Sequence, residues 1–215
     1  MQARARWGCL LAAVLLSTTP VAAQQTRAQA LDALLQSEPV VRLAALNRLA
    51  EIGLMVDADH VIERLCDADP RVRIAAQSAI WQIWNRSGDA EIDMLFARGV
   101  EQMQSSALDD ALETFNEIVR RKPDFAEGWN KRATIYFLLG QNEKSLQDCD
   151  EVFKRNPRHF GALSGAGQIY LQLGNPRRAL ELFRQAVQVN PNLDGPARMI
   201  PLLEQHLRKV ERNTI

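Results

Sequence analysis

Apolar residues recur at intervals of three and four along most of the chain, and polar residues fill the positions between them. This spacing places the apolar side chains on one face of a helix. Strict alternation of apolar and polar residues, which is typical of strands, does not occur. The pattern therefore predicts an all-α protein.

An eight-residue pattern occurs twice, as Glu38–Ala45 and as Asp69–Ala76, with an offset of 31 residues. Each copy begins with an acidic residue followed by proline. Both residues suit the first turn of a helix, since proline needs no partner for its nitrogen there and a carboxylate favours the positive end of the helix dipole. Each copy ends in an Ala-Ala pair, which lets a neighbouring helix approach closely. We expect two helix pairs over residues 27–88.

A second repeat, of 34 residues, follows. Pro123, Pro157 and Pro191 mark its period, and small and aromatic residues keep the same spacing. The aligned sets are Ala111, Ser145 and Ala179; Phe115, Cys149 and Phe183; Tyr136 and Tyr170; and Gly140 and Gly174. Three copies cover 92–125, 126–159 and 160–193. The first copy is atypical, with Gln102 and Ser106 at the Tyr and Gly positions, so we expect it to adjoin the N-terminal pairs.

The first pattern resembles HEAT repeats, whose second helix carries similar Asp-Pro, Val-Arg and Ala-Ala elements. The second resembles tetratricopeptide repeats. The resemblance implies a right-handed α-solenoid of stacked antiparallel helix pairs. Its parts are HEAT-like repeats over 24–90, three tetratricopeptide repeats over 91–193, and a capping helix with a tail over 194–215. In that last segment apolar residues such as Met199, Leu203 and Leu207 recur at helical spacing.

The first 23 residues have the pattern of a secretory signal peptide. Arg4 and Arg6 precede an apolar run from Cys9 to Leu16, and small residues stand before a cut at Gln24. The run is too short to span a bilayer, for which about 20 apolar residues are needed. We expect cleavage, export to the periplasm as a soluble protein and no membrane span afterwards; retention as an N-terminal anchor is the alternative.

The chain has 215 residues, 47% of them hydrophobic, with 26 basic and 26 acidic side chains. These values exclude a largely disordered or collagen-like chain, and the balanced charge gives no electrostatic reason to expect nucleic-acid binding. Two cysteines, Cys66 and Cys149, follow the signal segment. We expect both to be buried as small apolar residues and not to be bridged.

No pattern of catalytic or metal-binding residues stands out. His60, His159 and His206 lie in separate segments without Cys or carboxylate companions at ligand spacing. Gly165 and Gly167 lie inside a helical segment with no preceding strand, so packing explains them better than a phosphate loop. We expect no enzymatic activity and no cofactor.

The resemblance to tetratricopeptide repeats implies a concave groove, lined by the first helix of each repeat, that binds peptide segments of other proteins. Carried over to this sequence, the groove positions are Phe96, Val100, Met103, Glu127, Asn130, Thr134, Phe137, Ser164, Gln168, Leu171 and Gln172. The alternative for the apolar members is packing between repeats. Phe96 and Val100 stand where chaperone-binding arrays have lysine and asparagine, so clamping of a C-terminal carboxylate in this groove is not expected.

The sequence therefore favours an exported adaptor that binds a protein or peptide partner in its groove. The alternative is a self-associating homo-oligomer, or a cell-envelope-associated protein, whose contacts lie outside the groove. Trp81 and Trp84, one turn apart at the end of the HEAT-like segment, form either a hydrophobic joint between the two regions or an exposed contact site.

Overall fold

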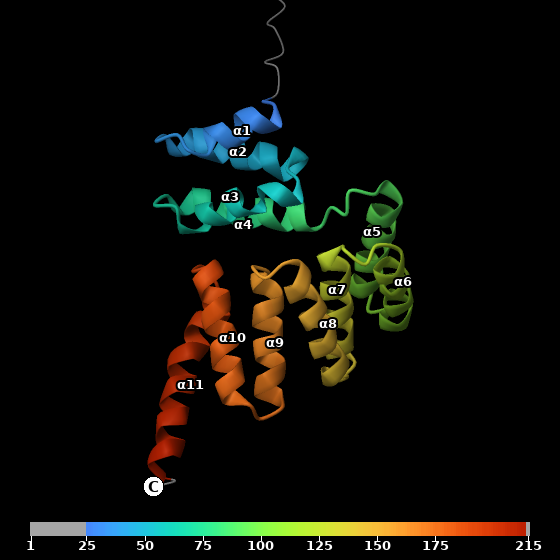
Figure 1. Cartoon of the computed structure of the whole chain (residues 1–215), viewed down its shortest axis with the longest axis vertical. Coiled ribbons are helices and arrows are strands. Elements are labelled where there is room, and N and C mark those ends of the chain that lie inside the picture. The colour runs from blue at the N-terminus through green and yellow to red at the C-terminus, as the bar shows by residue number, and fades with distance from the viewer. Residues whose placement is uncertain (1–24, 214–215) are drawn as a thin grey trace, which may run out of the picture.

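The computed structural model of the chain describes residues 25–213, which contain helices and short 3-10 turns but no strand (Figure 1). The predicted all-α fold of stacked helix pairs is confirmed. The predicted signal peptide, residues 1–23, lies outside the described residues. No helix of the described part is both long and apolar enough to cross a bilayer.

The N-terminal region consists of α1 (Arg27–Ala33), α2 (Pro39–Ile52), α3 (Ala58–Glu63) and α4 (Pro70–Trp84), with 3-10 turns at Met55–Asp57 and Arg64–Cys66. The second region consists of α5 (Ala90–Gln104), α6 (Leu108–Arg121), α7 (Ala126–Leu138), α8 (Asn142–Arg155), α9 (Phe160–Gln172), α10 (Pro176–Val189) and α11 (Asp194–Asn213). Each helix from α5 to α11 packs on the next one in the chain, and α7 also contacts α5 and α9. The expected capping helix is α11, which lies against α10.

Small residues hold the two helices of a 34-residue repeat close together. A methyl group at Gly99 would lie 2.7 Å from Cε2 of Phe115, and one at Gly167 would lie 2.6 Å from Cε1 of Phe183. Real carbon atoms do not approach so closely, so the aromatic ring of the second helix occupies the space that glycine leaves in the first.

The turn between the two helices of each repeat needs a left-handed residue. Gly140 has φ of 71° and Gly174 has φ of 69°, and these are the two glycines that align at the 34-residue spacing. In the first repeat the same position holds Ser106 with φ of 61°. A residue with a side chain is strained in this conformation, so the first repeat keeps the turn geometry without the residue that suits it.

The 31-residue repeat is visible as a repeated arginine contact. Arg42 Nη1 donates to the carbonyl oxygens of Gln36 and Ser37, both at 2.7 Å. One repeat later, Arg73 Nη1 donates to the carbonyls of Asp67 and Ala68 at 2.8 and 3.2 Å. In both copies the arginine therefore fixes the turn that precedes its own helix.

The other guanidinium nitrogens of Arg42 and Arg73 bind the turn that packs next to their own helix. Arg42 Nε and Nη2 bind both carboxylate oxygens of Asp67 at 2.8 Å. Arg73 Nε instead binds Oδ1 of Asn192 at 3.1 Å, in the turn between α10 and α11. Asn192 thus takes the place at Arg73 that Asp67 has at Arg42. The turn between α10 and α11 therefore lies where a third N-terminal repeat would continue the stack.

The N-terminal helices accordingly lie across the upper ends of the later helices, above α9 and α10 in Figure 1. Asn190 Nδ2 donates to Gln77 at 2.9 Å, Asn192 Nδ2 to the carbonyl of Leu65 at 2.8 Å, and Arg158 pairs with Asp59 at 2.7 Å. The first repeat adjoins the N-terminal region through the connection at 85–89, where the Ser87 hydroxyl donates to Asp93 at 2.6 Å, while these longer-range contacts come from the turns that precede α9 and α11.

One expectation for the cysteines is also wrong. Cys149 is buried, but Cys66 is exposed, and both are free thiols. The 3-10 turn at Arg64–Cys66 directs Leu65 into the core at 0% exposure and leaves Cys66 on the outer side.

Candidate partner-binding surface

The groove positions predicted in the first repeat pack inside the array. Phe96 is 6% exposed and lies edge-on to Phe115 and Phe125, with ring centres 5.8 and 5.4 Å apart. Val100 and Met103 are half-buried against the same apolar cluster. The prediction that Phe96 faces a ligand is therefore wrong, since its ring fills the core between three helices.

Five of the positions predicted in the second and third repeats line two hollows on the face formed by α7, α9 and α11. The first hollow, of about 180 Å³, lies between α7 and α9 and includes Asn130, Thr134, Phe137 and Gln168. The second, of about 250 Å³, lies between α9 and α11 and includes Ser164, Gln168 and Met199. Gln168 belongs to both, so the two hollows adjoin. We call this surface the α7–α11 groove.

The remaining predicted positions have other contacts. Leu171 packs against the cluster between α10 and α11, and Gln172 Oε1 accepts a hydrogen bond from Asn142 Nδ2 at 3.4 Å. Glu127 is fully buried and does not face the α7–α11 groove.

Glu127 is held by three donors. Oε2 accepts from His159 Nε2 at 2.8 Å, and Oε1 lies 3.0 Å from both Asn130 Nδ2 and Lys131 Nζ. Burial opposes ionisation of this carboxyl, but the hydrogen bond from His159 and the charge of Lys131 outweigh it, so the pKa of Glu127 lies below its usual value.

His159 has no free ring nitrogen. Its Nδ1 accepts from the backbone N–H of Ala162 at 3.0 Å, capping α9, so the ring proton lies on Nε2 and is donated to Glu127. The pairing of His159 with Glu127 could not be predicted from the sequence, because the two residues are 32 positions apart and meet only when α7 and α9 stack. Neither nitrogen is available as a base or metal ligand, and no cluster of three or more potential metal ligands occurs within residues 25–213.

The two tryptophans form the joint between the regions, as the first alternative predicted. Trp84 is 3% exposed and stacks on His159 with ring centres 4.4 Å apart. Trp81 is half-buried and lies edge-on to Phe160 at 5.3 Å. A methyl group at Gly161 would lie 2.6 Å from Cη2 of Trp81, so this glycine makes room for the indole.

Trp81 also bounds the groove. Gly161, which it touches, lines the hollow between α7 and α9, and Lys131 Nζ of α7 lies 5.9 Å from the centre of its ring. On the other side of Trp81 a hollow of about 420 Å³ extends along α4 past Ile74 to Asn192. The N-terminal region thus supplies one end of the α7–α11 groove. The spacing of residues within the 34-residue repeats could not have predicted this contribution.

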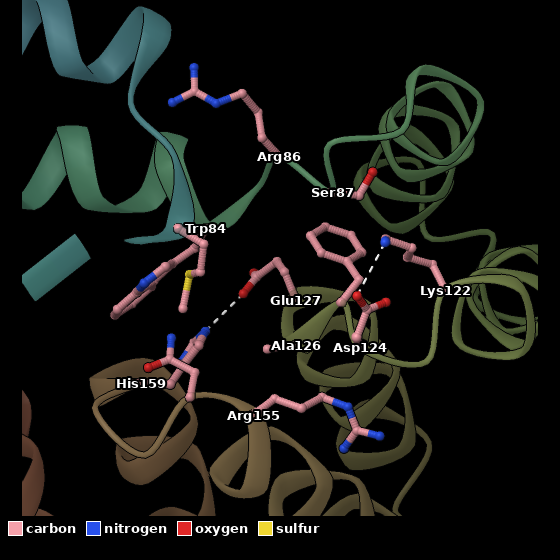
Figure 2. Close-up of a pocket in the computed structure, with 12 residues that line it drawn as sticks. Trp84, Arg86, Ser87, Lys122, Asp124, Ala126, Glu127, Arg155 and His159 are labelled. Atoms are coloured by element: carbon pink, nitrogen blue, oxygen red, sulfur yellow. Dashed lines mark hydrogen bonds and ion pairs between the residues drawn. The ribbon is translucent and has the colours of Figure 1, made fainter. Parts of the chain in front are cut away.

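A separate cavity of about 180 Å³ lies between the two regions (Figure 2). Its walls come from the end of α4, the connection to α5, and the turns before α7 and α9. The lining residues are Met55, Trp84, Arg86, Ser87, Lys122, Asp124, Phe125, Ala126, Glu127, Arg155, Asn156 and His159. We call it the junction cavity.

Comparison with known proteins identifies the second region. Residues 96–157 and 160–193 each match the tetratricopeptide repeat family. A TPR repeat-containing protein of Rhizobium etli is 34% identical over 125 residues, covering 58% of this chain and 61% of that protein. Anaphase-promoting complex subunit 7 of Dictyostelium discoideum is 37% identical over 78 residues, 36% of this chain and 13% of that protein. The chain thus spans less than two thirds of each.

Solved structures share the fold. The first TPR of Spaghetti (RPAP3), bound to an HSP90 peptide, aligns with a TM-score of 0.53 at 19% identity, over 56% of this chain and 96% of that one. The type III secretion chaperone SycD of Yersinia enterocolitica, in complex with a peptide of the translocator YopD, aligns with a TM-score of 0.52 at 14% identity, over 55% and 95% of the two chains. The family matches span residues 96–193, so the HEAT-like interpretation of 24–90 stays a prediction.

Proposed function

We propose that this chain, whose residues 96–157 and 160–193 match the tetratricopeptide repeat family, is a protein-interaction adaptor that binds a peptide segment of a partner in the α7–α11 groove. The observation that carries this proposal is the pair of adjoining hollows joined at Gln168. They place amide, hydroxyl and apolar side chains along one surface, as a bound peptide requires for its backbone and its side chains.

The chemistry of the groove favours an extended segment with one apolar anchor. Phe137 is half-buried beside the polar side chains of Asn130 and Thr134, and Gln168 is exposed at the boundary of the two hollows. A buried aromatic anchor with polar neighbours is a common arrangement in peptide recognition. The peptides bound by the RPAP3 and SycD repeats support this use of the fold.

Selection of peptides from a display library on the purified protein tests the proposal. Binding of the selected peptides is then measured with Phe137→Ala and Gln168→Ala, and with Leu173→Ala as a matched control. Leu173 is an exposed apolar residue at the end of α9 outside both hollows. We expect Phe137→Ala to weaken binding by about tenfold or more, as truncation of an anchor residue does, and Leu173→Ala to leave it unchanged.

Equal affinity of all three variants would place the binding surface elsewhere and reject the groove. If no peptide is selected and light scattering shows a defined oligomer, self-association replaces the adaptor function.

We further propose that the adaptor is exported, because residues 1–23 have the pattern of a signal peptide. Expression in a Gram-negative host and N-terminal sequencing of the periplasmic fraction test this. The expected mature chain begins at Gln24, whereas a full-length chain retained in the cytoplasm would contradict export.

A further inference from the structure

The junction cavity contains hydrogen-bond donors that nothing in residues 25–213 uses. Trp84 Nε1, Asn156 Nδ2 and Arg86 Nε are all buried and have no hydrogen-bond partner there. The residues Trp84 and Asn156 are only 3% and 4% exposed. Buried polar groups are nearly always paired, and an unpaired one is destabilising. The Arg86 guanidinium extends away from the cavity toward the end of α2 (Figure 2), so Trp84 and Asn156 supply the two unpaired donors that indicate a bound hydrogen-bond acceptor.

The buried carboxylate and the hydroxyl of the cavity are already engaged. Both carboxylate oxygens of Glu127 hold the donors described above, and Asp124 pairs with Lys122 at 3.1 Å on the exposed side (Figure 2). The Ser87 hydroxyl donates to Asp93 at 2.6 Å and accepts from the backbone N–H of Asp89 at 3.1 Å. The buried side-chain atoms of the lining that have no partner within residues 25–213 are therefore donors.

The first turn of α7 adds to this set. Ala126 and Glu127 line the cavity, and α7 has no side chain that caps its N-terminus. Backbone N–H groups at a helix start favour an acceptor, and the helix dipole favours a negative one.

The charges of the lining leave one positive charge in excess. Lys122 pairs with Asp124 at 3.1 Å, and Glu127 pairs with Lys131 at 3.0 Å. Arg155 pairs with Glu151 at 2.6 Å. Arg86 binds the carbonyls of Leu49, Ala50 and Glu51 at the end of α2, and no carboxylate of the described residues forms an ion pair with it.

The repeat itself provides an internal comparison. Asn156 and Asn190 occupy the same position of successive repeats, 34 residues apart. The amide of Asn190 donates to Gln77 of the N-terminal region at 2.9 Å. At Asn156 the N-terminal region supplies no acceptor and leaves the junction cavity instead. The missing partner is thus a local feature of this cavity, since the equivalent amide one repeat later is satisfied.

We propose that the junction cavity binds a carboxylate group, which accepts hydrogen bonds from Trp84 Nε1–H and the Asn156 amide and balances the excess positive charge. A carboxylate has only acceptor sites and one negative charge, so it matches both properties of the cavity. The carboxylate belongs either to a small free acid or to a peptide. This site is distinct from the α7–α11 groove and does not depend on the proposed function.

Amide NMR of the purified protein tests the proposal with acetate and with acetamide, a neutral compound of similar size. The indole N–H signal of Trp84, assigned from its loss in Trp84→Phe, is expected to shift saturably with acetate and not with acetamide. The indole signal of Trp129 serves as an internal control, because its Nε1 already donates to the carbonyl of Pro123 at 2.9 Å.

Asn156→Asp keeps the shape of the side chain but replaces its donor by a second negative charge. We expect it to weaken acetate binding by about tenfold or more, whereas Asn156→Ala, which removes the donor alone, has a smaller effect. Circular dichroism and the amide spectrum establish that both variants remain folded. Absence of saturation, equal shifts with acetamide, or unchanged affinity in Asn156→Asp would show that water fills the cavity and would overturn the proposal.

Two further probes distinguish the sources of the carboxylate. Triglycine with a free C-terminus is compared with its C-terminal amide. Tighter binding of the free-acid peptide than of acetate identifies a peptide terminus as the ligand. Saturable binding of acetate without binding of either peptide identifies a small free acid.

Discussion

Both helical regions of this protein have apolar cores, but they differ in the contact that recurs with each repeat. In the tetratricopeptide repeats, an aromatic ring of one helix fills the space left by a glycine in the other, as Phe183 does at Gly167. In the N-terminal pairs, an arginine connects one turn to the next, as Arg42 does with Asp67. Apolar packing dominates the first kind of contact, and charge and hydrogen bonding dominate the second.

The junction between the regions uses both means at once. Trp81 of the N-terminal region fills the space at Gly161, and Arg73 binds Asn192 of the third repeat. The two regions, which have repeats of different length, therefore join through the same two kinds of contact that occur within them: an aromatic ring packed against a glycine, and an arginine bound to the next turn. From these differences we predict how much each contact contributes to the free energy of unfolding.

The largest difference is expected between the two equivalent arginines. Arg42 and Asp67 form a nearly buried pair with side chains 10% and 4% exposed. Removing one member of such a pair costs about 3–5 kcal/mol. Arg42→Ala should therefore destabilise the protein by this amount, whereas Arg73→Ala, which loses only neutral partners, should cost about 1–2 kcal/mol. Denaturant unfolding measures both, and equal losses would contradict the assigned roles.

The same pair should respond to pH, unlike the neutral Arg73–Asn192 contact. Burial opposes ionisation of Asp67, but the hydrogen bonds from Arg42 prevail and lower the pKa of its carboxyl. The contribution of the pair is present above the unfolded pKa of about 3.9 and is lost as the pH falls through the lower folded value. The stability difference between the wild type and Arg42→Ala should therefore shrink below about pH 4. A difference that stays constant down to pH 2 would exclude the ionised pair.

Two glycines of α9 test the aromatic contact of the junction. Gly161→Ala places a methyl group 2.6 Å from Trp81, whereas Gly165 has no atom within 4 Å of the same position. We expect Gly161→Ala to lower the stability by about 1–3 kcal/mol through overpacking. The control Gly165→Ala should raise the stability by about 0.5–1 kcal/mol, since alanine favours the helix. Thermal unfolding measures both, and a stabilising Gly161→Ala would show that Trp81 does not occupy this space.

The smallest effect is expected at the left-handed turn of the first repeat. Ser106→Gly removes the strain of a side chain at φ of 61° and should stabilise the protein by about 0.5–1 kcal/mol. Gly140→Ala, at the equivalent turn, should destabilise it by a similar amount or more. A destabilising Ser106→Gly would mean that the serine side chain itself stabilises this turn.

The sequence predicts the periodic part of the structure well. The 34-residue spacing locates the helix pairs and aligns Gly140 with Gly174 at the turns, because each depends on local geometry or on the adjacent repeat. Five of the predicted groove positions, Asn130, Thr134, Phe137, Ser164 and Gln168, line the α7–α11 groove. The prediction fails for Phe96, because the depth of a position depends on neighbouring helices.

Contacts between distant segments could not be predicted. His159 and Glu127 meet only when their helices stack, and Trp84 packs on Phe160 of the third repeat although it precedes the first repeat in sequence. The position of the N-terminal region depends on single residues such as Asn192 and Gly161, which carry no periodic signal. The junction cavity is a consequence of this docking and is therefore invisible in the sequence.

The most direct test of the account is whether the N-terminal region docks on the third repeat. A nitroxide on Cys66 reports this in a Cys9→Ser background, because Cys66 is exposed while Cys149 is buried with its pKa raised to about 12. The carbonyl of the preceding Leu65 lies 2.8 Å from Asn192 Nδ2. We expect strong paramagnetic broadening of the amide signals of residues 190–194 and little broadening at 102–108. Broadening confined to residues 25–88 would contradict it.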